Sequence, residues 1–266
     1  MFFIHSSSIY FMIGWFSTGR DKAARDLLEY AVRKGIEISF VFCNREKGES
    51  EESDKFIDLV ESYGFDLICF SSKKFLPELR KKNKKEWRTL YDEEILKLIP
   101  HKDLNVLAGY MLILSPLACD TLNMINLHPA LPDGPKGTWQ EVIWELIRSN
   151  AKETGAMMHL VTKDLDRGPV VTYCRFSIDY PDLREDFENL LKFRSFEEIK
   201  KEGHPLFYKI REEELKREFP LIGYTIKAFE NKEIEIKNKK IYSHGKEIKG
   251  YDISERVERE VKMLSQ

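Results

Sequence analysis

The sequence predicts an α/β protein built on a doubly wound, mostly parallel sheet, and three observations support this fold class. Short apolar runs rich in β-forming residues alternate with longer stretches whose apolar residues recur at helical spacing. Polar turns separate the two kinds of segment. The 266 residues are enough for one large domain or for a domain with an appendage. Strands that alternate with helices favour parallel pairing through right-handed crossovers.

The first half of the chain shows this alternation most clearly. Ile9 to Phe16 predicts a buried strand, and positions 24, 27, 28, 31 and 32 place apolar residues on one face of a following helix. The run is too short to cross a bilayer and follows no positively charged segment, so we expect a core strand and not an export signal. The remaining expected elements are strands at 36–42 and 66–70, helices at 53–63 and 75–99, and buried runs at 104–108 and 124–127.

The second half predicts a different arrangement. A helix marked by apolar positions from 139 to 147 precedes two antiparallel strands at 154–161 and 170–178. Further expected elements are charged helical sequence at 181–202, a long helix at 205–229 despite Pro220, a hairpin at 234–241 and a helix at 254–263. With no repeat and no Gly/Ser linker, we expect residues 1–178 to form the main α/β domain and residues 179–266 a small helical and hairpin extension packed on it.

Charge and cysteine content narrow the classes of partner. The chain has 43 basic and 45 acidic side chains, a net charge of -2, so no global field attracts nucleic acid or an anionic membrane. Eight basic and two acidic residues gather between Lys73 and Arg88 around Trp87, where a solvated helix face is favoured over a nucleic-acid site. The four cysteines form no paired motif, which fits a reducing cytoplasm.

Asn126 and His128 stand two residues apart at the end of an apolar run. Alternate residues of a strand point to the same side, and Pro129 and Pro132 prevent the run from continuing as a central strand. The pair is therefore expected at a strand exit, where α/β proteins place ligands. The alternative is a buried turn in which both side chains satisfy local backbone groups.

Two loops offer further polar groups. Ser17 to Arg20 separate the first strand from its helix, whose N-terminus would attract an anion, although an ordinary turn capped by Thr18 or Asp21 fits equally well. A later loop carries Asp164, Asp166 and Arg167. A carboxylate facing His128 would orient its imidazole and raise its pKa, whereas the alternative is a solvated loop with a surface ion pair.

Histidine spacing gives little support for a metal site. His159 lies within an expected strand and is interpreted as a satisfied core or rim histidine. The six histidines and four cysteines show no spacing typical of metal ligands, so no metal is expected.

Three segments follow one another in a fixed order, from Val106 to Pro116, from Ile125 to Pro132 and from Gly155 to Val170, with 38 positions from His128 to Asp166. In this order they resemble the folate-dependent formyltransferase family, most closely its members that act on glycinamide ribonucleotide. The resemblance covers about 9 to 251 and implies a Rossmann-like formyltransferase fold. It also implies that 10-formyltetrahydrofolate serves as cosubstrate in purine synthesis and formylates the primary amine of glycinamide ribonucleotide.

The resemblance assigns roles to individual positions. Asn126, His128 and Asp166 match the family's catalytic residues: Asn126 and protonated His128 would stabilise a tetrahedral oxyanion, and Asp166 would keep His128 charged and assist proton transfer. The substrate phosphate would bind at Thr18, Gly19, Arg20 and Asp21. The expected substrate- and folate-binding residues are Gly109, Met111, Leu112, Leu114, Pro129, Val161, Thr162, Asp164 and Gly168.

Three departures from the family pattern leave the formyl acceptor open. The first turn is not Gly-rich, Leu112 replaces a basic residue that would contact the folate glutamate tail, and the family's ribose-contacting Glu aligns ambiguously near Glu214. Alternatives are therefore a sugar-nucleotide N-formyltransferase, a 10-formyltetrahydrofolate hydrolase, or a protein that binds folate or nucleotide without turnover. A methionyl-tRNA formyltransferase would need a further basic domain. The oligomeric state is not predicted, and a homodimer is compatible with the sequence.

Overall fold

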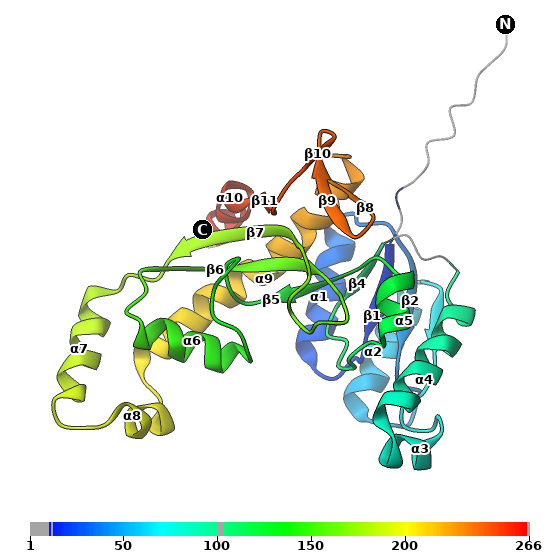
Figure 1. Cartoon of the computed structure of the whole chain (residues 1–266), viewed down its shortest axis with the longest axis horizontal. Helices are drawn as coiled ribbons and strands as arrows, with labels where there is room; N and C mark the ends of the chain where they lie inside the picture. The colour runs from blue at the N-terminus through cyan, green and yellow to red at the C-terminus, as the bar shows by residue number, and fades with distance from the viewer. Residues whose placement is uncertain (1–10, 12, 101–103, 265–266) are drawn as a thin grey trace, which may run out of the picture. The chain divides into compact units, whose positions relative to one another are not determined.

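A computed structural model describes residue 11, residues 13–100 and residues 104–264 of the chain (Figure 1). The chain forms two compact units, Met1–Met124 and Ile125–Gln266. Ile9, Tyr10 and Met12 of the first expected strand, together with residues 1–8, lie outside the described residues.

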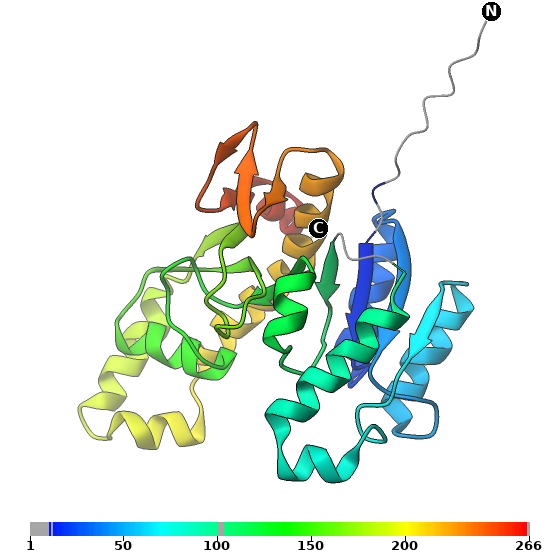
Figure 2. The same cartoon turned by 45° about the vertical axis from the view of Figure 1, so that its right-hand side comes forward.

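The first unit contains parallel strands in the order β4-β1-β2-β3. α1 contacts α2, while α4 contacts α3 and α5 (Figure 2). Parallel pairing requires these helical crossovers, which confirms the alternation predicted from the sequence. The strands are β1 (Ile13–Ser17), β2 (Ile38–Cys43), β3 (Leu67–Cys69) and β4 (Asn105–Leu107), and the helices are α1 (Lys22–Arg33), α2 (Glu51–Ser62), α3 (Pro77–Lys82), α4 (Lys84–Leu98) and α5 (Pro116–Thr121).

The core of the first unit is aromatic. Every residue of β1 is buried, as expected of a strand with neighbours on both sides and helices on its faces. The ring centroid of Phe16 lies 5.0 Å from that of Phe42 and 5.8 Å from that of Tyr110. Large rings fit here because Gly14 leaves room for Phe40 and Asn105 beside the strand.

The second unit is built on strands in the order β5-β6-β7-β11, with antiparallel β5/β6 and β6/β7 pairs and a parallel β7/β11 pair. The antiparallel strands predicted after residue 150 are thus confirmed. A separate antiparallel sheet has the order β8-β9-β10. The strands are β5 (Met124–His128), β6 (Glu153–Leu160), β7 (Val170–Ser177), β8 (Glu235–Lys237), β9 (Lys240–Ser243), β10 (Lys246–Glu247) and β11 (Tyr251–Asp252), and the helices are α6 (Trp139–Arg148), α7 (Pro181–Leu191), α8 (Phe196–Glu202), α9 (Pro205–Glu230) and α10 (Ser254–Leu264).

α9 is the longest described helix and contacts β6, β7, α6, α7 and α10. It continues past Pro220, as the apolar pattern predicts. On the α6 side, Trp144 stacks on Phe207 with ring centroids 4.7 Å apart. β7 ends at Ser177 and α7 begins at Pro181, but the treatment of residues 179–266 as an extension stays a prediction.

Two predicted helices are each divided. The stretch 75–99 forms α3 and α4 because Asn83 adopts a non-helical conformation and its side chain accepts a hydrogen bond from the Glu86 amide. The stretch 181–202 forms α7 and α8 because Ser195 starts a new capping box with Glu198. The predicted hairpin at 234–241 gains a third strand, β10.

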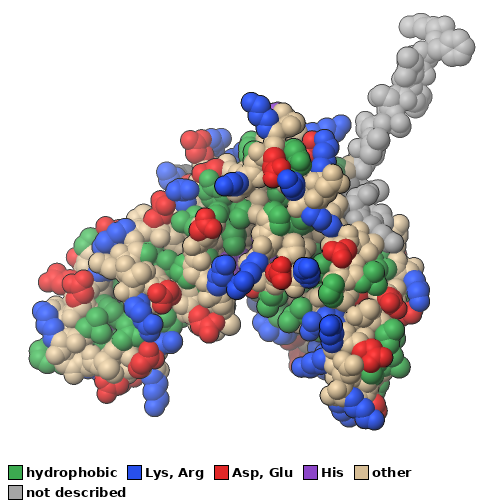
Figure 3. All heavy atoms as spheres, viewed as in Figure 1, with side chains coloured by type: hydrophobic (Ala, Val, Ile, Leu, Met, Phe, Trp, Pro, Cys, Tyr) green, Lys and Arg blue, Asp and Glu red, His purple; other side chains and the backbone are tan. Residues whose placement is uncertain are grey.

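Lys, Arg, Asp and Glu side chains are interspersed over the visible surface of each unit, as the near-zero net charge leads one to expect (Figure 3). Among the described residues, every helix is too short or too polar to span a membrane.

Gly14→Ala should destabilise the protein by about 3 kcal/mol, near the upper end of overpacking costs. A Cβ at this position would lie 2.0 Å from Asn105 Oδ1 and 2.5 Å from Phe40 Cζ. Gly35→Ala is the control, because Gly35 has open space around it and a φ of +62°, so only backbone strain of about 1 kcal/mol is expected. Urea unfolding measures both changes, and equal costs would show that packing around Gly14 is looser than described.

Candidate active site

β5 presents Asn126 and His128 on the same face of its sheet, because they are two residues apart in one strand. β6 runs antiparallel beside it and pairs His159 with Asn126. Directly paired residues also share a face, so three polar side chains project from one side of this strand pair. His128 and His159 are both almost fully buried, with exposed fractions of 3% and 2%.

The ring of His128 is oriented by the segment that follows β5. Its Nε2 lies 3.3 Å from the carbonyl oxygen of Pro135. A carbonyl can only accept a hydrogen bond, so Nε2 carries the proton in this contact. The ring centroid of His128 lies 6.5 Å from that of His159, with the two rings nearly perpendicular.

His159 connects this strand pair to the loop after β6. Its Nδ1 is 3.2 Å from the Leu160 carbonyl oxygen, and its Nε2 is 3.6 Å from Asp166 Oδ1, beyond hydrogen-bond distance. Burial lowers the pKa of His159, although the Leu160 carbonyl and the Asp166 carboxylate act in the opposite direction. The imidazole is therefore held neutral near pH 7 next to a carboxylate that is 30% exposed.

Backbone geometry turns Asp166 back towards the sheet. Asp166 adopts a left-handed conformation with φ +53°. The Leu160 amide donates to the Pro169 carbonyl at 2.9 Å, which closes the loop between β6 and β7. Position 168 requires glycine, because a Cβ there would lie 1.6 Å from the Leu160 carbonyl oxygen.

The structure thus gathers Asn126, His128 and Asp166 around one residue that sequence reasoning missed. Within the described residues, the imidazole that lies within 4 Å of the Asp166 carboxylate is that of His159, and not that of His128. The sequence showed only one histidine in an apolar strand, which usually indicates a core residue. The register of β6 against β5 would have revealed that His159 lies opposite Asn126.

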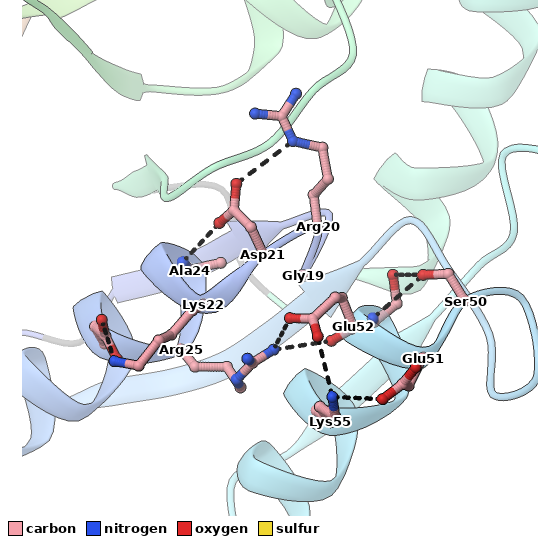
Figure 4. A network of polar contacts seen from close by, with 12 residues as sticks. Gly19, Arg20, Asp21, Lys22, Ala24, Arg25, Ser50, Glu51, Glu52 and Lys55 are labelled. Carbon is pink, nitrogen blue, oxygen red and sulfur yellow. Dashed lines mark hydrogen bonds and ion pairs between the residues drawn. The ribbon is translucent and has the colours of Figure 1, made fainter.

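The first turn is organised by internal hydrogen bonds (Figure 4). Asp21 caps α1 by accepting a hydrogen bond from the Ala24 amide at 3.2 Å, and Arg20 Nε lies 3.5 Å from the Asp21 carboxylate. Thr18 Oγ1 accepts from the Met111 amide, and the Gly19 amide donates to Ser17 Oγ. A carboxylate of the protein therefore occupies the N-terminus of α1, where an anion would otherwise bind.

A cavity of about 360 Å³ lies beside this turn in the first unit. Arg20, Arg45 and Lys73 contribute positive charge to its lining, together with the hydroxyl-bearing residues Thr18, Ser50 and Ser53. Two carboxylates, those of Glu51 and Glu52, also line it, but both pair with Lys55, and Glu52 pairs with Arg25 as well (Figure 4). Arg20 pairs with Asp21 at 3.5 Å and Arg45 with Glu49 at 3.7 Å, so among the described lining residues Lys73 is the basic group left to pair with an anion.

The predicted folate-binding positions fall in both units. In the first unit, Met111 and Leu112 line a cavity of about 200 Å³ together with four residues of the segment from Lys73 to Arg88. Leu114 is buried. The carbonyl oxygen of Gly109 accepts a hydrogen bond from the Thr18 amide. The four residues are Arg80, Lys84, Trp87 and Arg88.

In the second unit, Pro129 directly follows β5, while Val161, Thr162, Asp164 and Gly168 belong to the loop that carries Asp166. Thr162 Oγ1 donates to the Asp164 carbonyl at 3.1 Å, and the Arg167 amide donates to the same oxygen. These bonds brace the loop from within.

Glu214, the ambiguous position of the sequence comparison, lies inside the second unit. Its side chain is fully buried in α9 and accepts a hydrogen bond from Arg211 at 3.1 Å. Burial raises the pKa of Glu214 to about 8, an effect that the Arg211 charge only partly offsets.

Comparison with known proteins gives a consistent result. The family model described as formyl transferase matches residues 16–199. The phosphoribosylglycinamide formyltransferase of Escherichia coli (strain K12) is 32% identical over 103 residues, 37% of this chain and 48% of that protein. That of Dictyostelium discoideum is 31% identical over 171 residues, 59% of this chain and 82% of that protein. Formyltetrahydrofolate deformylase 1 of Arabidopsis thaliana is 29% identical over 57% of this chain and 42% of its own length.

Solved structures share the fold at lower identity. A phosphoribosylglycinamide formyltransferase from Coxiella burnetii superposes with a TM-score of 0.62 at 21% identity, covering 91% of this chain and 98% of that one. A formyltetrahydrofolate deformylase from Pseudomonas putida gives 0.55 at 19% identity, covering 87% and 69%. The matches span less than half of the E. coli and Arabidopsis relatives, and they include two kinds of enzyme.

Glu214→Gln should flatten the dependence of stability on pH. A carboxyl whose folded-state pKa is raised stabilises the fold below its unfolded pKa of about 4.5, and this contribution is lost as the pH rises through about 8. The variant should therefore lose less stability than the wild type between pH 5 and pH 9 in urea unfolding.

Glu213→Gln is the matched control on the same helix. Burial raises the pKa of Glu213, but hydrogen bonds from Lys216, Arg217 and Lys209 outweigh it and lower the pKa to about 2. The contribution of the Glu213 carboxylate to stability is present above its unfolded pKa and is lost in acid. Glu213→Gln should therefore be less stable than the wild type at neutral pH. Parallel pH profiles for the wild type and Glu214→Gln would contradict the burial of Glu214.

Proposed function

The chain belongs to the formyl transferase family, and we propose that it transfers the formyl group of 10-formyltetrahydrofolate to the primary amine of glycinamide ribonucleotide. The observation that carries this proposal is the common face of β5 and β6, from which Asn126, His128 and His159 project beside the Asp166 loop. Relatives named phosphoribosylglycinamide formyltransferase support the choice of acceptor.

In the proposed reaction, the acceptor amine attacks the formyl carbon and forms a tetrahedral intermediate with a negatively charged oxygen. Asn126 and His128 supply N–H donors to this oxyanion, which would stabilise the transition state more than the ground state. Collapse of the intermediate breaks the bond from the formyl carbon to the folate nitrogen, and that nitrogen takes up a proton. The products are the formylated amine and tetrahydrofolate.

Asp166 is the proposed proton acceptor for the attacking amine. Its carboxylate is partly exposed, so a water molecule can carry the proton to it. His159 supports this role, because its buried ring has Nε2 3.6 Å from Asp166 and its centroid 6.5 Å from that of His128. Because His159 is neutral, it does not compensate the negative charge of Asp166, and the carboxylate can accept the proton.

The acceptor's phosphate is assigned to the cavity beside the first turn. Because Asp21 caps α1, we propose that Arg20, Arg45 and Lys73 hold the phosphate in addition to Thr18 and Gly19. Three basic groups suit a doubly charged phosphate better than a neutral amine. The reducing cytoplasm is the proposed location, since the substrates are soluble and none of the four cysteines forms a disulfide among the described residues.

Hydrolysis of 10-formyltetrahydrofolate is the second candidate, because the similar proteins include formyltetrahydrofolate deformylases. Water would replace the amine at the same carbon. We expect tetrahydrofolate release only when glycinamide ribonucleotide is present, and little with an unphosphorylated amine or a sugar-nucleotide amine. Release at the same rate without any amine would overturn the transfer proposal in favour of hydrolysis.

His128→Ala should lower kcat by about a hundredfold or more, as expected for loss of an oxyanion donor. His204→Asn is the matched control: His204 is also buried and pairs with an aspartate, Asp186, but it caps α9 by accepting the Leu206 amide. The control should retain nearly wild-type kcat. An effect of His128→Ala below about tenfold would refute the catalytic assignment.

Lys73→Ala should raise the KM for the phosphorylated acceptor by about tenfold, the scale of one charge-assisted hydrogen bond, without changing the KM for the folate. Lys74→Ala is the control, because Lys74 pairs with Glu46 at 2.7 Å and does not line the cavity. Steady-state kinetics with each substrate varied in turn gives both constants. An equal effect of the two variants would remove Lys73 from the phosphate site.

A further inference from the structure

A third cavity lies away from the residues assigned to chemistry, within the helices of the second unit. It has a volume of about 270 Å³ and is lined by the end of α6, one side of α7 and the starts of α8 and α9. Ile147, Phe187 and Leu206 form apolar walls and are themselves buried. Leu191 also lines the cavity and is 41% exposed. Such a lining suits an apolar group of modest size.

One wall of this cavity carries a buried positive charge. The Arg184 side chain is 6% exposed, and its terminal nitrogens donate to Asn150 Oδ1 and to the carbonyl oxygens of Ala151 and Ile178. All three partners are neutral. The Nε of Arg184 has no hydrogen-bond partner within the part of the chain that the structure describes, and the carboxylate of Asp179 lies 3.6 Å away from it.

This arrangement leaves the guanidinium without a hydrogen-bonded carboxylate among the described residues. Burial lowers the pKa of Arg184, and the charges of Asp179 and Glu188 offset this only in part. A buried charge is costly unless an opposite charge and full hydrogen bonding accompany it. An anion in the cavity would supply both.

A second cation stands at the same cavity. Arg148 lies over the ring of Phe196, with its guanidinium carbon 4.6 Å from the ring centroid. It pairs with Glu145 at 3.7 Å and Glu197 at 3.3 Å, both largely exposed. The residues that line the cavity therefore include two cations and one anion, Glu188.

We propose that this cavity binds a small organic carboxylate with an aromatic or branched apolar body. Its carboxylate pairs with Arg184 and Arg148, and its apolar body lies against Ile147, Phe187 and Leu206. The volume lies just below the range of about 300 to 1,000 Å³ usual for ligand pockets, so a nucleotide or a whole folate is too large. The site goes beyond the proposed formyl transfer and does not depend on it.

The test compares carboxylates with their neutral amides. Phenylacetate and 4-methylpentanoate are titrated into the full chain by calorimetry, with phenylacetamide and 4-methylpentanamide as uncharged controls, in the absence of folate and acceptor. The carboxylates should bind about tenfold tighter or more, because charge-assisted hydrogen bonds are about twice as strong as neutral ones. The methyl NMR signals of Leu191 and Leu206 should shift with the same affinity.

Leu191→Trp should block the cavity and abolish binding, whereas Leu215→Trp is the matched control on an exposed leucine of α9 outside the cavity. Arg148→Gln should weaken carboxylate binding about fivefold or more without unfolding the protein, since Arg148 is 53% exposed. Failure of both carboxylates to bind, equal affinity for carboxylate and amide, or unchanged binding by Leu191→Trp would overturn the proposal. None of these outcomes bears on formyl transfer.

Discussion

The antiparallel pairing of β5, β6 and β7 is the interaction on which the candidate active site depends. β5 alone would present two polar side chains at a strand end. Pairing with β6 places His159 on the same face. The hydrogen bond from the Leu160 amide to the Pro169 carbonyl closes the loop that follows β6, and Asp166 in this loop lies next to His159. A shift of one residue in the pairing of β5 with β6 would turn the polar side chains of one of these strands to the opposite face of the sheet.

Burial sets the electrostatic behaviour of several groups in the fold, but the consequence differs with the partners available. His159 is kept neutral beside a carboxylate, while the pKa of Glu214 is raised to about 8 despite an adjacent arginine. The pKa of Asp92 is raised to about 6 by burial, although it accepts the Ser115 amide. Arg184 keeps a buried guanidinium whose described hydrogen-bond acceptors are all neutral. Such groups mark the positions where a proton or a counter-ion matters most.

Sequence periodicity predicts the helices and strands whose formation depends on residues close together in the chain. β1 and α1 follow from a buried apolar run and a helical stripe, and the division of α3 from α4 has a local cap at Asn83 that the apolar pattern did not reveal. The register between paired strands could not be predicted from the sequence. This register pairs His159 with Asn126 in β5 and β6, and Cys43 with Cys69 in β2 and β3, where the neighbouring Cys69 raises the pKa of the buried Cys43 thiol. Spacing along the chain contains no trace of either pair.

The central claim is that Asp166, held by the loop after β6, completes a site for formyl transfer. Its most direct test is the single-turnover rate of tetrahydrofolate formation by Asp166→Asn with saturating 10-formyltetrahydrofolate and glycinamide ribonucleotide. The account predicts a fall of about a hundredfold to ten-thousandfold, the range of general acid–base contributions, with unfolding in urea unchanged. A rate within about threefold of the wild type would contradict it, because a carboxylate that moves the proton cannot be replaced by an amide without such a loss.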